Sequence, residues 1–517
     1  MAAPTWLRRP RRALLAAGST LALAAALLAG TETAAQAVAQ APCDLYAAGG
    51  TPCVAAHSTT RALYGGYQGS LYQVRRASDA ATRNIGVLGT GGYADAAAQD
   101  AFCAGTTCVI TVIYDQSGRG NHLTQAPAGG AAGGPDDLAP ATAAPVTVAG
   151  HKAYGVYVAA GTGYRNNRTN GIATGDQPEG MYAVLDGTHF GGGCCFDYGN
   201  AETNNLDTGN GHMEAIYFGD STIWGSGTGN GPWVMADLEN GLFSGVNAGY
   251  NANDPSVSHR FLTAIVKGAP NLWAIKAGNA QSGGLSTYYN GVRPNVAGYH
   301  PMHKEGAIIL GIGGDNSKSS SGTFYEGVLT AGYPSDATEN AVQANITTAN
   351  YQPGKVTSSA LTPGARVSLK ATTACCTADY LRRSADATVA ISPLTSGSSA
   401  ADRADATWIV RAGLADSSCL SLESAAAPGQ YLRHYGFQLH TAASDGTALF
   451  KQDATFCLQA GHSGQGYSFQ AANYPNRFLR HYTYTGYVAG DGVGGNAWDS
   501  AGSWSADTSW LTAAPLS

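Results

Sequence analysis

A threefold internal repeat in the last third of the chain constrains the fold more than any other feature of this sequence. A motif of Tyr or Phe, Leu, Arg and a second basic residue recurs at Tyr380-Leu381-Arg382-Arg383, Tyr431-Leu432-Arg433-His434 and Phe478-Leu479-Arg480-His481. A second motif follows each copy, at Asp405-Ala406-Thr407-Trp408, Asp453-Ala454-Thr455-Phe456 and Asp507-Thr508-Ser509-Trp510. Three copies of about fifty residues predict a threefold-symmetric β-trefoil, because an open solenoid would need capping repeats. We therefore assign residues 363–517 to a β-trefoil domain.

The preceding part of the chain, residues 41–351, has the pattern of an all-β sandwich. Short alternating apolar runs recur between turns rich in Gly, Asn and Asp, and no long stretch has a clean helical period. The clearest runs are residues 108–114, 181–185, 213–218 and 261–266. Asn290-Gly291 is predicted to form a tight hairpin turn. Residues 352–362 are predicted to be a short linker.

Residues 1–40 have the layout of a secretory signal peptide. Four arginines form a basic start, residues 13–29 are almost continuously apolar, and small residues in A-x-A patterns follow. An uncleaved membrane anchor is the alternative, but the apolar run is short for a span of about 20 residues. No later run approaches that length, so we expect a secreted, extracellular protein that is not anchored in a membrane.

The low charge of the chain excludes several classes of partner. Charged residues make up 12% of the sequence, about half of the usual share of ~25%. The sequence offers no basic face for nucleic acid and no polybasic patch for anionic lipid. Since nothing in it indicates an oligomer, we expect a monomer.

All ten cysteines follow the predicted signal peptide, and an even number in a secreted chain indicates disulfides. Cys43 with Cys53 and Cys103 with Cys108 look like local pairs, although spacing alone does not fix the connectivity. A zinc site would need clustered C-x-x-C or histidine partners. The sequence has neither, so we predict no metal and no other cofactor.

The adjacent cysteines Cys194 and Cys195 follow three glycines. They could close an eight-membered ring with each other, or each could pair with a distant cysteine. If they pair with each other, they form a rigid apolar plate that could lie against a sugar face, and the glycines would leave that plate accessible.

Several carboxylates that lie close to glycine or asparagine in the sequence are the candidates for catalysis. Asp237 and Glu239 lie in an Asp-Leu-Glu-Asn-Gly segment, and in an extended conformation they would point to the same face. Asp315 lies in a glycine-rich segment, and Asp197 and Glu214 are further candidates. Two carboxylates can act as nucleophile and general acid/base on a glycosidic bond. The alternative is that these residues only form turns beside glycine.

The repeats of the trefoil pair a histidine with an aspartate in two of the three copies. His434 with Asp453 and His481 with Asp507 could hydrogen-bond sugar hydroxyls while Tyr435 and Tyr482 cover a sugar face. In the first copy Arg383 replaces the histidine, which leaves the binding capacity of that lobe open. The alternative is that these histidines pack and the aspartates close turns.

Five motifs resemble secreted α-L-arabinofuranosidases of glycoside hydrolase family 54 that carry a family 42 carbohydrate-binding module. The motifs are Cys43-Asp44-Leu45-Tyr46, Tyr114-Asp115-Gln116-Ser117-Gly118-Arg119-Gly120-Asn121, Gly193-Cys194-Cys195-Phe196-Asp197-Tyr198-Gly199-Asn200, Met235-Ala236-Asp237-Leu238-Glu239-Asn240-Gly241 and Gly313-Gly314-Asp315-Asn316. The resemblance covers nearly the whole chain after the signal peptide. It implies a concanavalin-like β-sandwich catalytic domain, an arabinofuranose-binding β-trefoil, and retaining, exo-acting release of arabinofuranosyl groups from arabinoxylan and arabinan.

The resemblance also implies roles for individual residues. Glu239 would be the nucleophile and Asp315 the general acid/base. Asp237, Asn240 and Gly314 would hold sugar hydroxyls, Trp224 would wall the pocket, and Cys194–Cys195 would form a disulfide beneath the sugar. In the trefoil, the two His–Asp pairs with Tyr435 and Tyr482 would bind arabinose side chains. With this resemblance we predict the disulfides Cys43–Cys53, Cys103–Cys108, Cys194–Cys195 and Cys419–Cys457, and leave Cys375 and Cys376 unassigned.

Two other functions remain open at this point. The segment 114–121 also resembles laminin-G and concanavalin-like sandwiches, many of which only bind, so a non-catalytic furanose-binding protein is one alternative. A galactofuranosidase or β-xylosidase is the other, because these sugars share part of the hydroxyl pattern of arabinofuranose.

Overall fold

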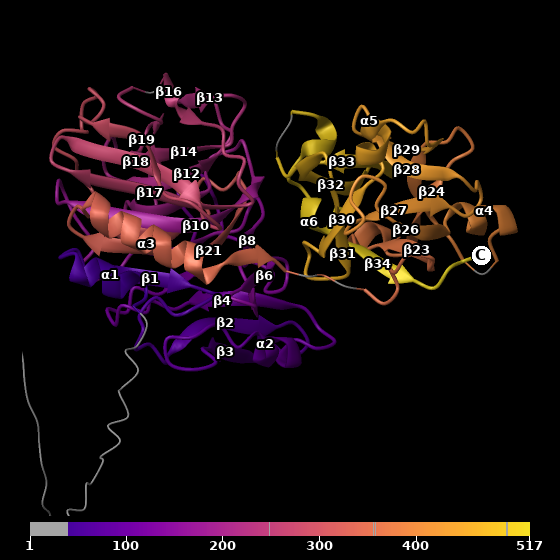
Figure 1. Ribbon diagram of the computed structural model, residues 1–517, viewed down its shortest axis with the longest axis horizontal. Coiled ribbons are helices and arrows are strands. Elements are labelled where there is room, and N and C mark those ends of the chain that lie inside the picture. The colour runs from indigo at the N-terminus through magenta and orange to yellow at the C-terminus, as the bar shows by residue number, and fades with distance from the viewer. Residues whose placement is uncertain (1–39, 248, 355, 357, 396, 493–494) are drawn as a thin grey trace, which may run out of the picture. The chain divides into compact units, whose positions relative to one another are not determined.

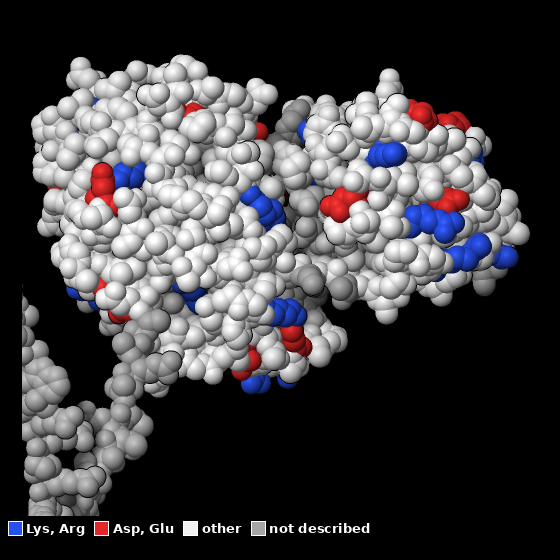
Figure 2. Space-filling view, in the orientation of Figure 1, with Lys and Arg blue, Asp and Glu red and all other residues white. Residues whose placement is uncertain are grey.

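The computed structural model describes residues 40–517 except residues 248, 355, 357, 396 and 493–494. The predicted signal peptide therefore lies outside the described residues, apart from Gln40. The described chain is mostly β-structure and forms a β-sandwich followed by a β-trefoil (Figure 1). Within this part of the chain, no helix is long and apolar enough to cross a membrane. Most of the surface visible in Figure 2 belongs to uncharged residues, as the composition leads us to expect.

Two large sheets form the sandwich. The seven-stranded sheet has the order β1-β21-β10-β17-β18-β19, with β8 paired to β21. Its strands are β1 (Cys53–Ser58), β8 (Val156–Val158), β10 (Glu179–Phe190), β17 (Phe261–Ala269), β18 (Leu272–Asn279), β19 (Ser286–Gly291) and β21 (Gly322–Ala331). The ten-stranded sheet has the order β15-β14-β12-β11-β20-β9-β5-β4-β2-β3. Its strands are β2 (Ser70–Arg76), β3 (Thr82–Gly86), β4 (Cys108–Ile113), β5 (Leu123–Gln125), β9 (Tyr164–Asn166), β11 (Asp197–Ala201), β12 (Glu214–Gly219), β14 (Trp233–Asp237), β15 (Leu242–Phe243) and β20 (Ala307–Leu310).

Smaller elements complete this part of the chain. β13 (Ser226–Thr228) pairs with β16 (Tyr250–Pro255), and β6 (Pro145–Val148) lies between β7 (His151–Tyr154) and β22 (Tyr351–Pro353). The helices are α1 (Pro42–Ala48), α2 (Ala96–Phe102) and α3 (Asp336–Ala349). The four apolar runs named above form strands β4, β10, β12 and β17, with Tyr114 and Met213 just outside β4 and β12. The structure therefore confirms four strands at these places.

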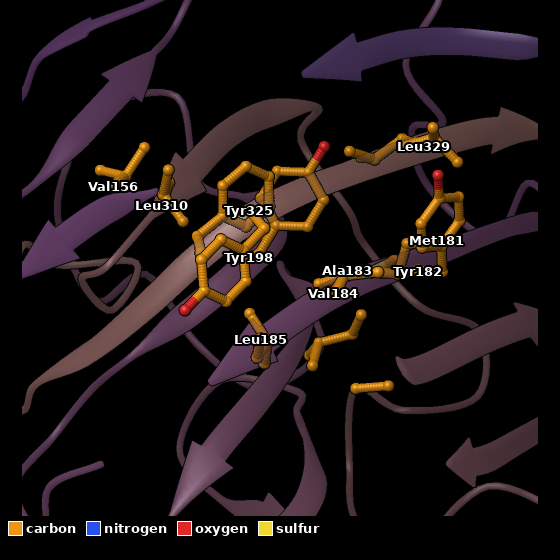
Figure 3. Close-up of a cluster of buried hydrophobic side chains, with 14 of the residues drawn as sticks. Val156, Met181, Tyr182, Ala183, Val184, Leu185, Tyr198, Leu310, Tyr325 and Leu329 are labelled. Carbon is orange, nitrogen blue, oxygen red and sulfur yellow. The ribbon is translucent and has the colours of Figure 1, made fainter. Parts of the chain in front are cut away.

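The core of the sandwich lies between the two large sheets. Tyr198 of β11 packs against Phe324 of β21, with their ring centroids 4.9 Å apart. Figure 3 shows Tyr198 and Tyr325, with Val184 and Leu185 of β10, among the buried side chains of this hydrophobic cluster. All of these side chains are buried. The central strands are buried on both faces, so the loops at their ends extend from a rigid scaffold.

Helix α3 was not predicted from the sequence, because its apolar stripe is narrow. Val342 and Ile346 are its fully buried aliphatic residues beyond alanine. Its buried Glu339 instead accepts hydrogen bonds from Lys267 of β17 at 2.9 Å and Lys276 of β18 at 2.7 Å. A buried ion cluster therefore docks this helix on the seven-stranded sheet, and a search for helical apolar periodicity does not detect such a contact.

The hairpin turn that we predict at Asn290-Gly291 is wrong. Both residues belong to β19, where Asn290 pairs with Ala274 and Gly291 with Trp273. The chain reverses earlier, between β18 and β19. β19 lies at the edge of its sheet and Asn290 is exposed, so a polar residue and a glycine are tolerated inside the strand. The first two residues of the predicted linker, Gln352 and Pro353, likewise pair with β6 in β22.

Twelve strands build the trefoil, four from each repeat. They are β23 (Arg366–Ala371), β24 (Asp379–Arg383), β25 (Val389–Pro393), β26 (Trp408–Ala412), β27 (Leu420–Ser424), β28 (Gln430–Tyr435), β29 (Gln438–Ala443), β30 (Phe456–Ala460), β31 (Tyr467–Ala471), β32 (Tyr474–Tyr482), β33 (Thr485–Ala489) and β34 (Trp510–Ala513). Short helices join them: η1 (Ala374–Cys376), α4 (Ala400–Asp405), α5 (Ala448–Asp453), η2 (Ala497–Asp499) and α6 (Trp504–Asp507).

Equivalent contacts relate the repeats. The indole of Trp408 donates to the carbonyl of Leu381 at 3.0 Å, and that of Trp510 donates to the carbonyl of Leu479 at 3.0 Å. All four side chains are fully buried. In the first and third repeats, the two sequence motifs therefore meet in the core. In the second repeat, Phe456 has no indole N–H group, but it is buried in the same hydrophobic cluster as Leu432.

All ten cysteines form disulfides. The four predicted pairs are confirmed: Cys43–Cys53, Cys103–Cys108, Cys194–Cys195 and Cys419–Cys457. The two cysteines left unassigned, Cys375 and Cys376, also pair with each other.

Candidate active site

Loops that follow β10, β11, β12, β14 and β20 surround a cavity of about 180 Å³. A cavity of roughly 150 Å³ holds a benzene ring, so this one suits a single sugar ring. The residues predicted for the catalytic pocket that line it are Cys194, Trp224, Asp237, Glu239, Asn240, Gly314 and Asp315. Cys195 lies directly behind Cys194 and is fully buried.

The segment that carries Glu239 does not follow the extended path that we predict for it. β14 ends at Asp237, and Glu239 and Asn240 have positive φ angles of 61° and 54°. The Oδ1 atom of Asp237 accepts the backbone N–H of Glu239 at 2.9 Å and so closes the bend. Left-handed backbone costs energy in residues other than glycine and concentrates at functional sites. This bend, and not strand alternation, brings both carboxyl groups to the cavity.

Three backbone N–H groups hold the carboxylate of Glu239. Oε1 accepts from Thr208 at 2.6 Å and from Gly209 at 3.0 Å, and Oε2 accepts from His212 at 3.1 Å. The hydroxyl of Tyr299 donates to the backbone carbonyl of Glu239. Since an ionised carboxylate only accepts hydrogen bonds, this set of donors suits a fixed carboxylate anion, as a nucleophile requires.

Asp315 reaches the cavity from the loop that follows β20. Its Oδ1 atom accepts the N–H of Ser317 at 2.9 Å, and its backbone carbonyl accepts the N–H of Ala131 at 3.0 Å. The side chain is half-buried, whereas Glu239 is buried. The two carboxyl groups therefore come from separate loops and differ in their exposure to solvent.

The disulfide between Cys194 and Cys195 forms one wall of the cavity. The Sγ atom of Cys195 lies 3.6 Å from Oδ2 of Asp237, and Trp224 packs against the same apolar cluster. A Cβ atom on Gly313 would lie 3.5 Å from Sγ of Cys195 and 2.4 Å from Oγ of Ser317. Glycine at this position thus lets the two loops approach each other closely.

Two further carboxyl groups, those of Asp197 and Glu202, are buried near the catalytic candidates. Glu202 lines the cavity, whereas Asp197 does not. The carboxyl group of Asp197 interacts with that of Asp237, and the carboxyl group of Glu202 interacts with that of Glu239. No N–H or hydroxyl group of the described residues donates to the side-chain oxygens of Asp197 or Glu202. Burial and the contact with Asp237 raise the pKa of Asp197 well above its usual range. Burial and the interaction with Glu239 raise the pKa of Glu202 to about 10. Burial also raises the pKa of Asp237, to about 7.

Of these groups, sequence reasoning named Asp197 as a candidate and missed Glu202. Glu202 follows β11 without a distinctive motif of its own. Only the folded structure shows that Glu202 lies at the same cavity as Glu239, because the two residues are distant in sequence.

Glu214, another candidate from the sequence, does not line the cavity. Its carboxylate is fully buried and lies 3.0 Å from Arg293 and 3.1 Å from Lys304. Burial alone would raise the pKa of Glu214, but Arg293 and Lys304 lower it to about 2. Lys304 also pairs with Glu179 at 2.9 Å. Glu214 therefore belongs to a buried ion cluster and holds strands together.

Among the described residues, one group of side chains has the spacing of metal ligands. Potential ligand atoms of Cys194, Cys195 and Asp237 lie within 4.8 Å of one another. Two of them are disulfide sulfurs, whereas the thiolate is the form of cysteine that binds metals. The donor chemistry of this trio therefore does not suit a metal ion.

The second and third repeats of the trefoil build similar polar clusters. His434 Nε2 lies 3.0 Å from Oδ1 of Asn473, whose Nδ2 donates to Asp453 at 2.8 Å. In the third repeat, Nε2 of His481 lies 2.9 Å from Oγ1 of Thr373, which donates to Asp507 at 2.7 Å. The repeats thus bring each predicted His–Asp pair together through a bridging side chain, which the sequence did not indicate.

Arginines of the repeated motif complete these clusters. Arg433 pairs with Asp453 at 2.5 Å, and Arg480 pairs with Asp507 at 2.9 Å. Burial lowers the pKa of both histidines, so their imidazoles are neutral at pH 7. Tyr435 is 73% exposed and Tyr482 is half-buried, so both rings remain accessible to a ligand.

The first repeat differs from the other two. Arg382 pairs with Asp402 at 2.8 Å, and Arg383 donates to Thr441 at 3.1 Å. A guanidinium therefore occupies the place of the neutral imidazole, and the first lobe does not reproduce the donor and acceptor set of the other two.

Comparison with known proteins identifies both parts of the chain. The family model "Alpha-L-arabinofuranosidase B, catalytic" matches residues 42–352, and the "Alpha-L-arabinofuranosidase B (ABFB) domain" matches residues 369–512. The chain is 61% identical over 490 residues to an α-L-arabinofuranosidase of Hypocrea jecorina, which covers 94% of this chain and 97% of the relative. It is 60% identical over 487 residues to α-L-arabinofuranosidase B of Emericella nidulans, covering 92% and 95%.

Solved structures agree with these matches. A crystal structure of an arabinofuranosidase complexed with arabinofuranosyl-α-1,2-xylobiose is similar to this chain with a TM-score of 0.72 and 56% identity, over 92% of this chain and all of the other. A GH54 α-L-arabinofuranosidase soaked with a cyclic sulfate inhibitor has the same TM-score, identity and coverage. From these matches, the chain belongs to glycoside hydrolase family 54 and is an α-L-arabinofuranosidase with a C-terminal AbfB domain.

Proposed function

We propose that the chain is an exo-acting, retaining hydrolase in which Glu239 is the nucleophile and Asp315 is the general acid/base. The observation that carries this proposal is that one small cavity holds both carboxyl groups, each presented by a different loop. Other residues at the cavity would contact the sugar: Cys194 with its partner Cys195, Trp224, Asp237, Asn240 and Gly314.

In the first step, an oxygen of Glu239 would bond to the anomeric carbon while the bond from that carbon to the leaving oxygen breaks. Asp315 would transfer its proton to the leaving oxygen. In the second step, the ionised Asp315 would take a proton from water, whose oxygen attacks the anomeric carbon and releases Glu239 as a carboxylate. Such a mechanism needs carboxyl groups about 5–5.5 Å apart, whereas a separation of about 6.5–9.5 Å would favour inversion.

The size of the cavity supports action at chain ends and branches. A cavity of about 180 Å³ accommodates one ring and little more, so a terminal arabinofuranosyl group fits and an internal segment does not. We propose arabinoxylan and arabinan side chains as substrates. A similar solved arabinofuranosidase is complexed with arabinofuranosyl-α-1,2-xylobiose, which represents such a branch.

We propose that the trefoil holds the enzyme on arabinose-bearing polysaccharides. His434 with Asp453 and Tyr435 would form one site, and His481 with Asp507 and Tyr482 a second. Neutral imidazoles beside carboxylates supply both donors and acceptors for hydroxyl groups. Two weak sites on one polymer raise the local concentration of the catalytic domain.

We also propose that the protein is secreted and acts as a monomer. Five disulfides among the described residues support an oxidising compartment. Size-exclusion chromatography of culture medium would test both statements together, since an intracellular or oligomeric protein would be absent from the monomer fraction.

The catalytic assignment can be tested with three variants on an aryl α-L-arabinofuranoside. Glu239→Gln is expected to lose nearly all turnover. Asp315→Asn is expected to lose most turnover on a poor leaving group but less on an activated phenol, which needs no protonation. Glu214→Gln serves as the control and should keep its turnover. Survival of activity in Glu239→Gln would move the nucleophile to another residue.

The same assay separates the alternatives. A non-catalytic binding protein would give no turnover in the folded wild type, and a galactofuranosidase or β-xylosidase would prefer the corresponding aryl glycoside. The family matches do not favour either alternative.

A further inference from the structure

Glu202 is a buried carboxyl group that lines the same cavity as the proposed nucleophile, Glu239. Its side chain is fully buried. A Cβ atom on Gly314 would lie only 1.9 Å from Oε2 of Glu202. The backbone can therefore pass this close to Glu202 because residue 314 is a glycine. Arg165 donates to the backbone carbonyls of both Glu202 and Gly314. Glu202 is therefore fixed between the loop that follows β11 and the loop that carries Asp315.

The carboxyl groups of Glu202 and Glu239 share one cavity, and a hydrogen bond between them would require a proton. Two ionised carboxylates cannot hydrogen-bond each other, because each only accepts. Glu239 already accepts three backbone N–H groups. By contrast, no N–H group or hydroxyl of another described residue donates to either side-chain oxygen of Glu202. The anion is stabilised at Glu239 and not at Glu202, so the shared proton belongs to Glu202.

We propose that Glu202 is a positioning residue that stays protonated through the catalytic cycle and donates its O–H to the carboxylate of Glu239. This inference rests on the proposed role of Glu239 as the nucleophile. The donated hydrogen bond fixes the Glu239 carboxylate against the cavity. It also stabilises this carboxylate when the glycosyl–enzyme bond breaks in the second step, because Glu239 then regains its negative charge.

The surrounding charges favour a neutral Glu202. Acidic groups that act on it or on its partners are Glu239, Asp237, Asp197 and Asp315. The buried cation that faces this group is Arg165. Five carboxyl groups around one guanidinium cannot all ionise at low cost in a buried site. Burial and the interaction with Glu239 raise the pKa of Glu202 to about 10, so its proton remains at neutral pH.

Two variants of the full-length enzyme distinguish a proton donor from a space filler. Glu202→Gln keeps a neutral hydrogen-bond donor of nearly the same shape, whereas Glu202→Leu fills the space without a donor. The readout is the pH profile of kcat/KM on an aryl α-L-arabinofuranoside, whose acid limb reports the ionisation of the nucleophile in the free enzyme.

Glu202→Gln is expected to keep this acid limb within about 0.3 pH unit of the wild type, because the donor remains. Glu202→Leu is expected to move the limb upward by about 1 pH unit and to lower kcat by roughly tenfold, the scale of one hydrogen bond to a charged group. Circular dichroism and thermal unfolding would establish that both variants are folded.

Three results would overturn the proposal. An acid limb that moves downward in Glu202→Gln would mean that Glu202 is ionised and repels Glu239. A Glu202→Leu enzyme equal to the wild type would mean that Glu202 positions nothing. Equal losses in both folded variants would indicate a purely structural role. If Glu239→Gln kept full turnover, the proposed nucleophile itself would be wrong, and this separate control distinguishes the two failures.

A measurement on the wild type covers the case in which the variants do not fold. Infrared spectra of protein labelled with ¹³C-glutamate are recorded at a pH between about 8 and 9, where an ordinary glutamate is fully ionised. A carbonyl band of a protonated glutamic acid supports the proposal, and its absence overturns it.

Discussion

Replacing Glu214 with Gln separates a structural carboxylate from a catalytic one. Glu214 is as buried as Glu239, but it contacts Arg293 and Lys304 and does not line the cavity. Gln keeps the shape and removes the charge. We expect Glu214→Gln to lose stability and to keep the kcat of each folded molecule.

The magnitude follows from the pKa of Glu214. Its cationic partners, acting against burial, lower the pKa to about 2, against about 4.3 in an unfolded chain. A difference of roughly 2.3 pKa units corresponds to a contribution of about 3 kcal/mol to the free energy of unfolding at pH 7. Breaking a buried pair by removing one partner costs a similar ~3–5 kcal/mol. At about 2–4 °C for each kcal/mol, the unfolding temperature should fall by roughly 6–12 °C.

The sign of the pH dependence follows from the lowered pKa. This contribution is fully present above the unfolded pKa of about 4.3 and disappears as the pH falls toward 2. The difference in stability between the wild type and Glu214→Gln should therefore shrink as the pH falls from about 4 to about 2.

Thermal unfolding and kcat on an aryl α-L-arabinofuranoside are measured on the same samples. The control is Asp79→Asn, which breaks an exposed ion pair with Arg76 (2.7 Å) and should change neither quantity. A Glu214→Gln enzyme of unchanged stability whose kcat falls more than about a hundredfold would refute the reasoning and make Glu214 a catalytic candidate again.

Three further predictions concern the cavity and the trefoil. Gly314→Ala would place a Cβ atom 1.9 Å from Oε2 of Glu202. We expect roughly a hundredfold loss of kcat/KM, because small displacements at an active site are costly. Unchanged kinetics would show that the loop adapts freely. Replacing both Cys194 and Cys195 with Ser should raise KM on small aryl substrates by removing the apolar wall, and an unchanged KM would contradict its contact with the sugar. His481→Ala should weaken retention on insoluble arabinoxylan several-fold while turnover of the aryl substrate stays constant; equal loss of both would place His481 outside a separate binding site.

Features that recur or that form local motifs could be predicted from the sequence. The three copies of the Tyr/Phe-Leu-Arg motif predicted the trefoil, because each copy supplies a fully buried leucine to the same core, namely Leu381, Leu432 and Leu479. The adjacent cysteines and the Asp-Leu-Glu-Asn segment indicated the catalytic pocket, because they resemble motifs of a known family. Cys375–Cys376, by contrast, could not be paired from spacing.

Features that depend on contacts distant in sequence could not be predicted. The bend at Glu239 depends on a hydrogen bond from its own N–H to Asp237, and alternation rules assume an extended chain. Glu202 has no motif, and its proposed role depends on its place in the same cavity as Glu239. Helix α3 docks through buried lysines of two strands, and Asn290-Gly291 lies inside an edge strand, where turn statistics do not apply.

The most direct test of the account is the identity of the residue that carries the sugar between the two chemical steps. Asp315→Gly should slow the second step, so rapid quenching after mixing with an activated aryl α-L-arabinofuranoside should trap a covalent adduct. Peptide mapping by mass spectrometry is then expected to find one arabinosyl group on Glu239. An adduct on another residue, or no adduct together with an inverted first-formed anomer by NMR, would contradict the assignment of Glu239 as the nucleophile of a retaining enzyme.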